Sequence, residues 1–255
     1  MAKGSVFGMM LHQGLSFSPA LMKIPEAEAV FWPGCALMNL DGAILDKTMA
    51  VLRRHEPEIQ LACGCCGQPT VYLFPGKARI RKEKLVSLLK KHGVKRIYTA
   101  CPNCTLQLRE LADIEIIPIW PVLAEYVRKE DVTCAADAYI WHDPCPTRTE
   151  PDQQEAARKL LRISGCDCCQ PEHTGCKTRC CGNFHMMAAL DPEKSARMRR
   201  NRLAEFPEEK TIVSNCEGCL GAFRGEGRKT LHLLELLFGA SKARGWGNRF
   251  KTTLK

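Results

Sequence analysis

Cysteine is the residue type with the clearest chemical potential in this sequence, because its thiolate is both a metal ligand and a redox nucleophile. The chain has 255 residues and 16 cysteines. Ten of the cysteines form two series of the same order: an isolated cysteine, then Cys-Cys-Gly, then Cys-x-x-Cys. The first series is Cys35, Cys65, Cys66, Cys101 and Cys104, and the second is Cys145, Cys180, Cys181, Cys216 and Cys219. Thiols that recur in this way predict two metal or redox sites of one kind.

The spacing within the two series indicates an internal duplication. Cys65 and Cys180 are 115 residues apart (180 − 65), and so are Cys101 and Cys216 (216 − 101). The flanking sequences agree as well, since similar apolar runs precede the matched cysteines. These runs are residues 29–32 and 138–141, and residues 96–99 and 211–214. Self-similarity at a fixed period is typical of a repeated structural unit.

The elements that position these cysteines alternate along the chain. Short β-branched and aromatic runs predict buried strands at 29–32, 97–99, 114–119, 138–141 and 211–214. Amphipathic, charged stretches predict helices at 77–92, 153–163 and 192–206, the last with Asp191 as N-cap and Pro192 in its first turn. This order predicts an α/β fold of two duplicated Rossmann-like βαβ halves with parallel sheets. The cysteines then lie at the carboxyl ends of the strands, between the halves.

The domain boundaries follow from the duplication. We expect an N-terminal extension at residues 1–28, a first domain at 29–132, a second domain at 133–239 and a basic tail at 240–255. The extension is expected to bind a partner or the surface of the fold.

Composition narrows the class of protein. A hydrophobic fraction of 45% and a charged fraction of 25% are typical of a globular protein and exclude disorder and collagen-like structure. The chain is long for a disulfide scaffold, and it has no convincing export signal and no run of about 18 apolar residues. We therefore expect a reducing, cytoplasmic location, where many cysteines usually serve metal or redox chemistry.

The double pattern Cys … Cys-Cys-Gly … Cys-x-x-Cys resembles that of the CCG or cysteine-rich domain family, whose type member is the B subunit of heterodisulfide reductase. The resemblance covers roughly residues 30–239. It implies that each set of five thiolates holds a noncubane [4Fe-4S] cluster, and that a disulfide is cleaved between the two clusters. The implied ligands, by motif position, are the ten cysteines of the two series. The first spacer is shorter than is usual in the family, and Cys63 adds a thiol beside Cys65.

The resemblance also implies an oxidoreductase subunit that takes electrons from a partner. The chain has no ferredoxin-type cysteine run and no flavin or nicotinamide fingerprint, so a ferredoxin-like or flavin-containing subunit is the expected donor. One alternative is a non-catalytic electron-transfer subunit of a lactate-, glycerol-phosphate- or succinate-type complex. Others are a structural zinc scaffold and a thioredoxin-like interpretation of residues 98–104.

Six cysteines and several histidines lie outside the repeat. Cys166, Cys168 or Cys169, His173 and Cys176 could form an extra metal site, zinc for example, or could be free thiols near the second cluster. Cys134 is expected to be a lone thiol. His142 directly follows the strand before Cys145, so it could donate a hydrogen bond to a cluster sulfur, relay a proton, or be satisfied at a strand end. His185 is a further candidate, close after Cys181.

The charge balance has two explanations. The chain carries 37 Lys and Arg against 28 Asp and Glu, a formal net charge of +9. The segment 242–255 has basic but no acidic residues, and we interpret it as a solvated or partner-docking tail, with nucleic-acid binding as the alternative. Ten ligating thiolates would by themselves offset the +9. The excess of basic residues is then expected to balance buried anionic clusters and to dock an acidic electron donor, which leaves no need for nucleic acid.

Overall fold

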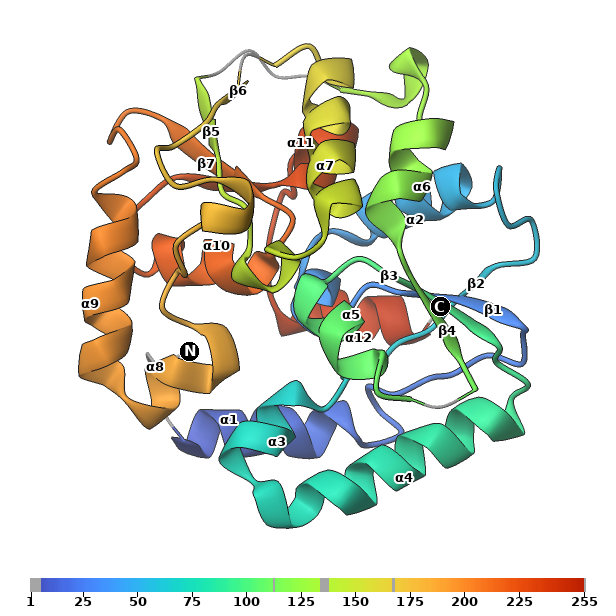
Figure 1. The fold of residues 1–255 in the computed structure, drawn as a ribbon. Coiled ribbons are helices and arrows are strands. Elements are labelled where there is room, and N and C mark those ends of the chain that lie inside the picture. Colours follow the sequence, from blue (N-terminus) through green and yellow to red (C-terminus); the bar gives the residue numbers. More distant parts are fainter. Residues whose placement is uncertain (1–5, 112, 134–137, 167, 255) are drawn as a thin grey trace. The chain divides into compact units, whose positions relative to one another are not determined.

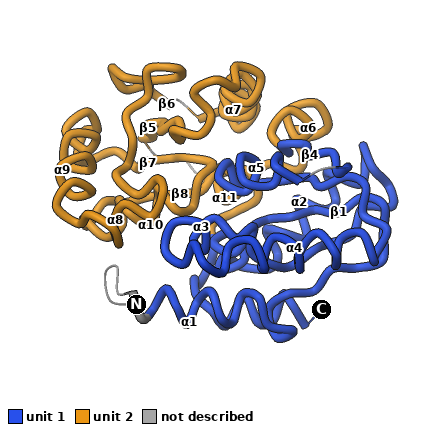
Figure 2. The backbone as a smooth tube through the Cα atoms, turned by 60° about the horizontal axis from the view of Figure 1, so that its bottom comes forward, with its two compact units in different colours: residues 1–119, 241–255 blue, residues 120–240 orange. Residues whose placement is uncertain are grey.

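The computed structural model describes residues 6–111, 113–133, 138–166 and 168–254 (Figure 1). Its backbone divides into two compact units, residues 1–119 with 241–255 and residues 120–240 (Figure 2). Each unit contains one four-stranded sheet in which every pair of neighbouring strands is parallel. The α/β fold with two duplicated parallel-sheet halves is thereby confirmed.

In the first unit the strand order is β2-β1-β3-β4. The strands are β1 Ala29–Trp32, β2 Gln60–Leu61, β3 Arg96–Thr99 and β4 Glu115–Pro118. The helices are α1 Val6–Ser16, α2 Gly42–Leu52, α3 Gln68–Leu73, α4 Pro75–Lys91, α5 Pro102–Leu108 and α12 Trp246–Leu254, with a 3-10 turn at Leu37–Asn39.

In the second unit the order is β6-β5-β7-β8, so each strand has a counterpart in the same place of the first sheet. The strands are β5 Tyr139–Trp141, β6 Cys168–Cys169, β7 Thr211–Ser214 and β8 Thr230–His232. The helices are α6 Ile119–Tyr126, α7 Pro151–Ile163, α8 Met187–Leu190, α9 Pro192–Leu203, α10 Glu217–Arg224 and α11 Leu233–Phe238. Shorter 3-10 turns lie at Lys129–Asp131, Cys145–Thr147, Gly175–Lys177 and Phe184–Met186.

Burial explains why the strands read as continuous apolar runs. All four residues of β1 and all four of β7 are buried, as expected for parallel strands that are covered on both faces. The apolar core of the first unit joins Trp32 and Leu89 to Cys104, and that of the second joins Ile212 to Cys219. Cysteines of the repeat are therefore part of the packed core.

Three short strands of the structure, β2, β6 and β8, are not predicted from the sequence. The edge strands β2 and β6 are two residues long and β8 is three, too short for a periodicity signal. Because β6 consists of Cys168 and Cys169, part of the extra cysteine segment is the counterpart of β2.

The predicted N-cap of α9 is present, since the Asp191 side chain accepts a hydrogen bond from the Lys194 amide at 2.9 Å.

The structure places a helix in each terminal segment and divides the two compact units after residue 119. The N-terminal extension contains the helix α1, and the basic tail contains α12, which buries Arg249, Thr252 and Thr253. The tail is thus not solvated throughout, because α12 packs on the 3-10 turn at 37–39 and on α2. The second unit begins at Trp120, whose ring lies 6.0 Å from that of His232.

Among the helices that the structure describes, none combines the length and the apolar character needed to cross a bilayer.

Candidate metal centres

The first five cysteines lie at the carboxyl ends of three neighbouring strands. Cys35 follows β1, and the pair Cys65 and Cys66 follows β2. Cys101 follows β3 as the N-cap residue of α5, and Cys104 lies within α5. Neighbouring parallel strands end at one edge of a sheet, so three loops deliver their thiols to one place. This is the edge at which open α/β sheets bind ligands.

Side-chain hydrogen bonds join the five thiols in a single sequence. Cys35 contacts Cys65, Cys65 contacts Cys66, Cys66 contacts Cys104, and Cys104 contacts Cys101. All five are buried or half-buried. The structure therefore gathers the first set completely.

The second unit repeats this sequence of contacts. Cys145 donates to Cys180 across 3.7 Å, Cys180 contacts Cys181, Cys181 contacts Cys219, and Cys219 contacts Cys216. The loops correspond as well, since Cys145 follows β5 and Cys216 is the N-cap residue of α10, just after β7. The two sets thus agree position by position in their contacts.

The thiols of each set have opposed acidities. Hydrogen bonds from Cys35 and Cys66 hold the pKa of Cys65 well below its usual range. The hydrogen bond to Cys65, with burial, raises the pKa of Cys35. In the second unit the pKa of Cys180 is lowered and that of Cys145 is raised for the same reasons. Crowded, buried thiols that cannot all ionise together are stabilised as thiolates when a metal replaces their protons.

The donor set fits an iron–sulfur group. Soft thiolates select zinc, copper(I) or iron–sulfur clusters, and clusters are bound by cysteines that converge from several loops. Structural zinc is almost always bound by four ligands, whereas five thiols converge in each unit. Cys35, Cys65, Cys66, Cys101 and Cys104 would hold such a group in the first unit, and Cys145, Cys180, Cys181, Cys216 and Cys219 in the second.

A glycine follows each adjacent cysteine pair and directs a backbone N–H at its first sulfur. The Gly67 amide donates to Cys65 Sγ at 3.5 Å, and the Gly182 amide donates to Cys180 Sγ at 3.3 Å. Both glycines have positive φ, +86° and +83°, which side-chain-bearing residues rarely adopt. The glycine of Cys-Cys-Gly therefore gives each site a backbone donor.

Cys63 is not part of the first set. Its thiol is buried, which raises its pKa, and it hydrogen-bonds to Thr253 of α12. Its backbone pairs with Lys23 through two hydrogen bonds of 2.8 and 2.9 Å. The counterpart of Cys180 is therefore Cys65.

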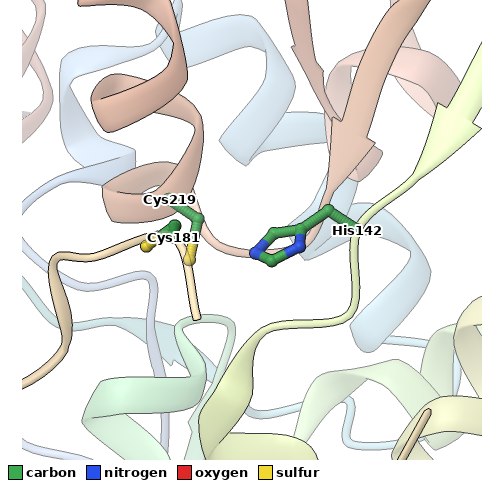
Figure 3. A group of neighbouring side chains, drawn as sticks. All are labelled: His142, Cys181 and Cys219. Atoms are coloured by element: carbon green, nitrogen blue, oxygen red, sulfur yellow. The ribbon is translucent and has the colours of Figure 1, made fainter. Parts of the chain in front are cut away.

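His142 lies against two thiols of the second set. One of its ring nitrogens and the sulfurs of Cys181 and Cys219 lie within 4.8 Å of one another (Figure 3). Its Nδ1 accepts a hydrogen bond from Arg202 Nε at 3.2 Å, which places the proton on Nε2. Nε2 is buried and has no hydrogen-bond partner among the described residues. Burial, together with Arg202, lowers the pKa of His142 to about 3, so the ring is neutral at pH 7.

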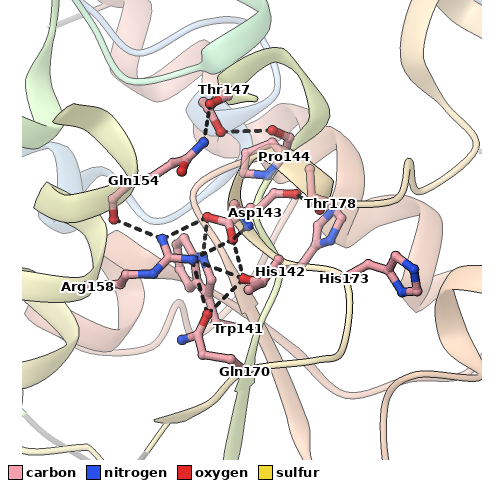
Figure 4. A network of polar contacts seen from close by, with 12 residues as sticks. Trp141, His142, Asp143, Pro144, Thr147, Gln154, Arg158, Gln170, His173 and Thr178 are labelled. Carbon is pink, nitrogen blue, oxygen red and sulfur yellow. Dashed lines mark hydrogen bonds and ion pairs between the residues drawn. The ribbon is translucent and has the colours of Figure 1, made fainter. Parts of the chain in front are cut away.

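Asp143, the next residue, organises the loop that leads to Cys180 (Figure 4). Its carboxylate pairs with Arg158 at 2.7 Å and accepts hydrogen bonds from Trp141 Nε1 at 2.8 Å and the Gly175 amide at 2.7 Å. Its backbone carbonyl accepts from Thr178 Oγ1 at 2.8 Å. Burial opposes its ionisation, but these hydrogen bonds outweigh burial and lower the pKa of Asp143 to about 2. Sequence reasoning did not single out Asp143, although it stands within the motif His-Asp-Pro-Cys.

The extra cysteine segment is dispersed. Cys169 Sγ accepts from Lys210 Nζ at 3.0 Å, His173 Nδ1 lies 3.2 Å from Glu205, and Cys176 is exposed. Within the described ranges, His142 with Cys181 and Cys219 is the single group of three potential metal-ligand residues whose ligand atoms approach within 4.8 Å. No such group contains Cys166, Cys168, His173 and Cys176, so the zinc site stays a prediction without support from these contacts.

Cys134 and His185 are the two remaining candidates from the sequence. Cys134 lies outside the described residues. His185 stacks on Phe184 with ring centroids 3.7 Å apart and has a positive φ of 55°. Burial lowers its pKa, while the negative charge of Cys180 opposes that shift, so His185 lies near the second set.

Comparison with known proteins gives a family match and a curated relative. The sequence matches the cysteine-rich domain family (CCG) over residues 29–109 and 139–224. It is 25% identical over 248 residues to the B subunit of fumarate reductase (CoM/CoB) of Methanothermobacter marburgensis. That alignment covers 89% of this chain and 49% of the relative, so the chain spans about half the relative's length.

Comparison with solved structures gives weaker likenesses. Picrophilus torridus aspartate racemase has a TM-score of 0.35 and 10% identity, with 89% of this chain and 100% of that chain covered. The glutamate racemase of Aquifex pyrophilus has a TM-score of 0.34 and 15% identity, with 82% and 80% covered. These scores are too low to carry an argument about fold or activity.

The family match rests on the same residues as the geometry. Each matched range contains one complete set of five cysteines, and together the ranges take up more than half of the chain. The chain therefore belongs to the cysteine-rich (CCG) domain family and carries one copy of the domain in each unit.

Proposed function

We propose that this protein is an iron–sulfur oxidoreductase subunit that binds two [4Fe-4S] clusters of noncubane type, one in each unit. The observation that carries the proposal is the identical order of sulfur contacts in the two sets of five cysteines. Five converging thiols in each unit support a cluster over a four-ligand zinc site. The relative from fumarate reductase (CoM/CoB) supports a role as one subunit of a redox complex.

The proposed reaction is reduction of a disulfide-type substrate. The S–S bond breaks, two electrons and two protons are taken up, and two thiols leave. Bound clusters would supply the electrons one at a time, after reduction by a ferredoxin-like or flavin-containing partner subunit.

The protein's own residues would bind the clusters, donate hydrogen bonds to their ligating sulfurs and position the loop that carries Cys180. The ten cysteines would bind the two clusters. The backbone amides of Gly67 and Gly182 donate hydrogen bonds to the sulfurs of Cys65 and Cys180. His142 keeps its proton on Nε2, the nitrogen left free to donate to a sulfur. Asp143 fixes the loop between β6 and Cys180 through Gly175 and Thr178.

Metal analysis with spectroscopy tests the proposal. Protein purified without oxygen is expected to contain roughly eight iron and eight sulfide per chain, the content of two four-iron clusters. An oxidised sample treated with a thiol is expected to give a new paramagnetic EPR signal, as for substrate bound at a cluster. Stoichiometric zinc with iron near zero would instead indicate the zinc scaffold.

In a second candidate function the protein binds the same clusters but does not itself catalyse a reaction. It is an electron-transfer subunit of a larger complex, and this candidate is favoured by the relative being one subunit, B, of fumarate reductase (CoM/CoB). Disulfide turnover by the isolated, chemically reduced protein separates the two candidates. Turnover supports the reductase, and full cluster content without turnover supports electron transfer.

A further inference from the structure

The helices at the two ends of the chain pack together in the first unit. Both α1 and α12 lie outside the matched family ranges 29–109 and 139–224. The rings of His12 and Trp246 are 5.6 Å apart, and Arg249 Nη2 donates to Ser16 Oγ at 3.0 Å. We call these two helices the terminal cap.

Arg249 is a buried cation with no acidic partner among the described residues. Its side chain is 0% exposed, and its contacts are the Ser16 hydroxyl, the His12 ring at 3.4 Å and the Trp246 ring at 5.2 Å. Within the described part of the chain no carboxylate pairs with it. An isolated charge is expensive to bury, so a buried guanidinium normally lies close to an anion.

The second unit shows the usual arrangement. Arg202 is also 0% exposed, but its Nη1 pairs with Glu205 at 2.7 Å while its Nε donates to His142. Arg202 thus has a carboxylate beside it, whereas Arg249 has none in the part of the chain that the structure describes. The difference indicates that the negative charge beside Arg249 does not come from an aspartate or glutamate side chain.

The thiols of the first set are the candidate anion. Contacts through α1 join Arg249 to this set: Arg249 Nη1 lies 3.4 Å from His12 Nε2, and His12 Nδ1 lies 3.0 Å from Gln13 Nε2, which lies 3.6 Å from Cys65 Sγ. A cluster held by five thiolates carries net negative charge, which these thiols lack when protonated. Arg249 is therefore placed to balance a charge that arises on loading.

The other helix of the cap supplies a hydrogen-bond donor. Gln13 is 0% exposed, and its Oε1 accepts from Thr70 Oγ1 at 2.6 Å and from Arg81 Nη1 at 3.3 Å. These two donors fix the amide orientation, so Nε2 faces Cys65 Sγ, 3.6 Å away. An N–H directed at a ligating sulfur raises the reduction potential of a cluster.

We propose that the terminal cap is built to hold the first cluster as an anion, with Arg249 as its counter-ion and Gln13 as a hydrogen-bond donor to Cys65. This proposal rests on the proposed function in one respect, that a cluster is bound by the first five cysteines. It assigns the two ends of the chain to tuning and retaining that cluster.

The experiment compares Arg249→Met with Lys251→Met, which removes one positive charge from an exposed position of the same helix. Both are made in the full chain with Cys181→Ser, so that the first cluster is observed alone. Arg249→Met is expected to shift the reduction potential to a lower value, followed by EPR, and to speed iron release to a chelator about tenfold. Lys251→Met is expected to match its parent, and Arg249→Lys to restore most of the potential.

A second pair keeps the test decisive if Arg249→Met does not fold. Gln13→Leu removes the donor to Cys65, and Gln107→Leu makes the same change on α5, where the amide reaches Glu110 at 3.5 Å and no ligating sulfur. Gln13→Leu is expected to lower the potential and Gln107→Leu to leave it unchanged. If iron is bound and neither Arg249→Met nor Gln13→Leu changes the reduction potential, the proposed role of the terminal cap is wrong and the proposed function stands. Protein that binds no iron would overturn the proposed function itself.

Discussion

At the scale of single residues, contacts and not spacing decide which thiols belong together. Cys63 and Cys65 are separated by one glycine, yet Cys63 hydrogen-bonds to Thr253 and Cys65 contacts Cys35 and Cys66. Both thiols are buried, so burial does not distinguish them either. What distinguishes them is the direction of each side chain after β2.

The first prediction compares these two kinds of cysteine. Cys66→Ser removes a thiol from the middle of the first set and is expected to lower the iron content by about half. Cys63→Ser is expected to keep the full iron content, because the Cys63 thiol is held by Thr253 of α12 and not by a member of the set. Iron and sulfide analysis after anaerobic purification measures both. Equal losses in the two variants would contradict the assignment.

The second prediction concerns His142. Its Nε2–H is positioned to donate to a sulfur of the second set, so His142→Leu is expected to lower the reduction potential of the second cluster. His142→Gln keeps an N–H near the same place and is expected to restore part of the shift. A redox titration followed by EPR, with the first cluster as internal reference, measures the change. A potential that is the same in all three proteins would assign His142 to packing alone.

At the scale of elements, the helix α9 fixes the loop that carries the second cysteine pair. Ser195 Oγ donates to the Gly182 carbonyl at 2.7 Å, and a Cβ on Gly182 would lie 2.3 Å from the Ser195 carbonyl oxygen. Asp143 fixes the other end of the loop through Gly175 and Thr178. The loop is therefore held at both ends before Cys180 and Cys181 bind anything.

The third prediction separates backbone strain from this close approach. Gly182 and Gly227 have nearly the same φ, +83° and +82°, but no atom lies within 4 Å of a Cβ built on Gly227. Gly227→Ala is expected to cost about 1 kcal/mol of stability from its left-handed backbone alone. Gly182→Ala is expected to cost more and to lower the iron content, because α9 must move away from the loop.

Thermal unfolding under anaerobic conditions, together with iron analysis, measures both glycine variants. Equal destabilisation of the two, with full iron in each, would show that the contact with Ser195 is relieved without cost.

At the scale of the whole molecule, two units each carry a complete set of ligands. The contacts within each set join cysteines of one unit only. The formal charge of +9 counts all ten of these thiols as neutral. Loading makes them thiolates, so buried cations such as Arg202 and Arg249 face more negative charge in the loaded protein.

The fourth prediction follows from the separate sets. Cys181→Ser is expected to remove the second cluster and to leave roughly four iron and four sulfide per chain. Combining it with Cys66→Ser is expected to remove the remainder. Iron analysis and EPR of the two single variants and the double variant measure this. Complete loss of iron in either single variant would mean that the sets bind cooperatively or share one cluster.

The sequence by itself determined the duplication, the α/β class and the ten cysteines of the two series. These features are local or periodic: a buried parallel strand is a short apolar run, and a repeated motif is visible as a fixed spacing. The short strands β2, β6 and β8 could not be predicted, because two or three residues carry no periodicity.

Only the tertiary structure decided which groups surround the thiols. It separated Cys63 from Cys65, dispersed Cys166–Cys176, and brought Gln13 and Arg249 from the two ends of the chain to the first set. Gln13 and Cys65 are 52 positions apart, and Arg249 and Ser16 are 233 positions apart. Contacts of this range leave no pattern in a single sequence, because they depend on how helices pack and not on the propensity of any segment.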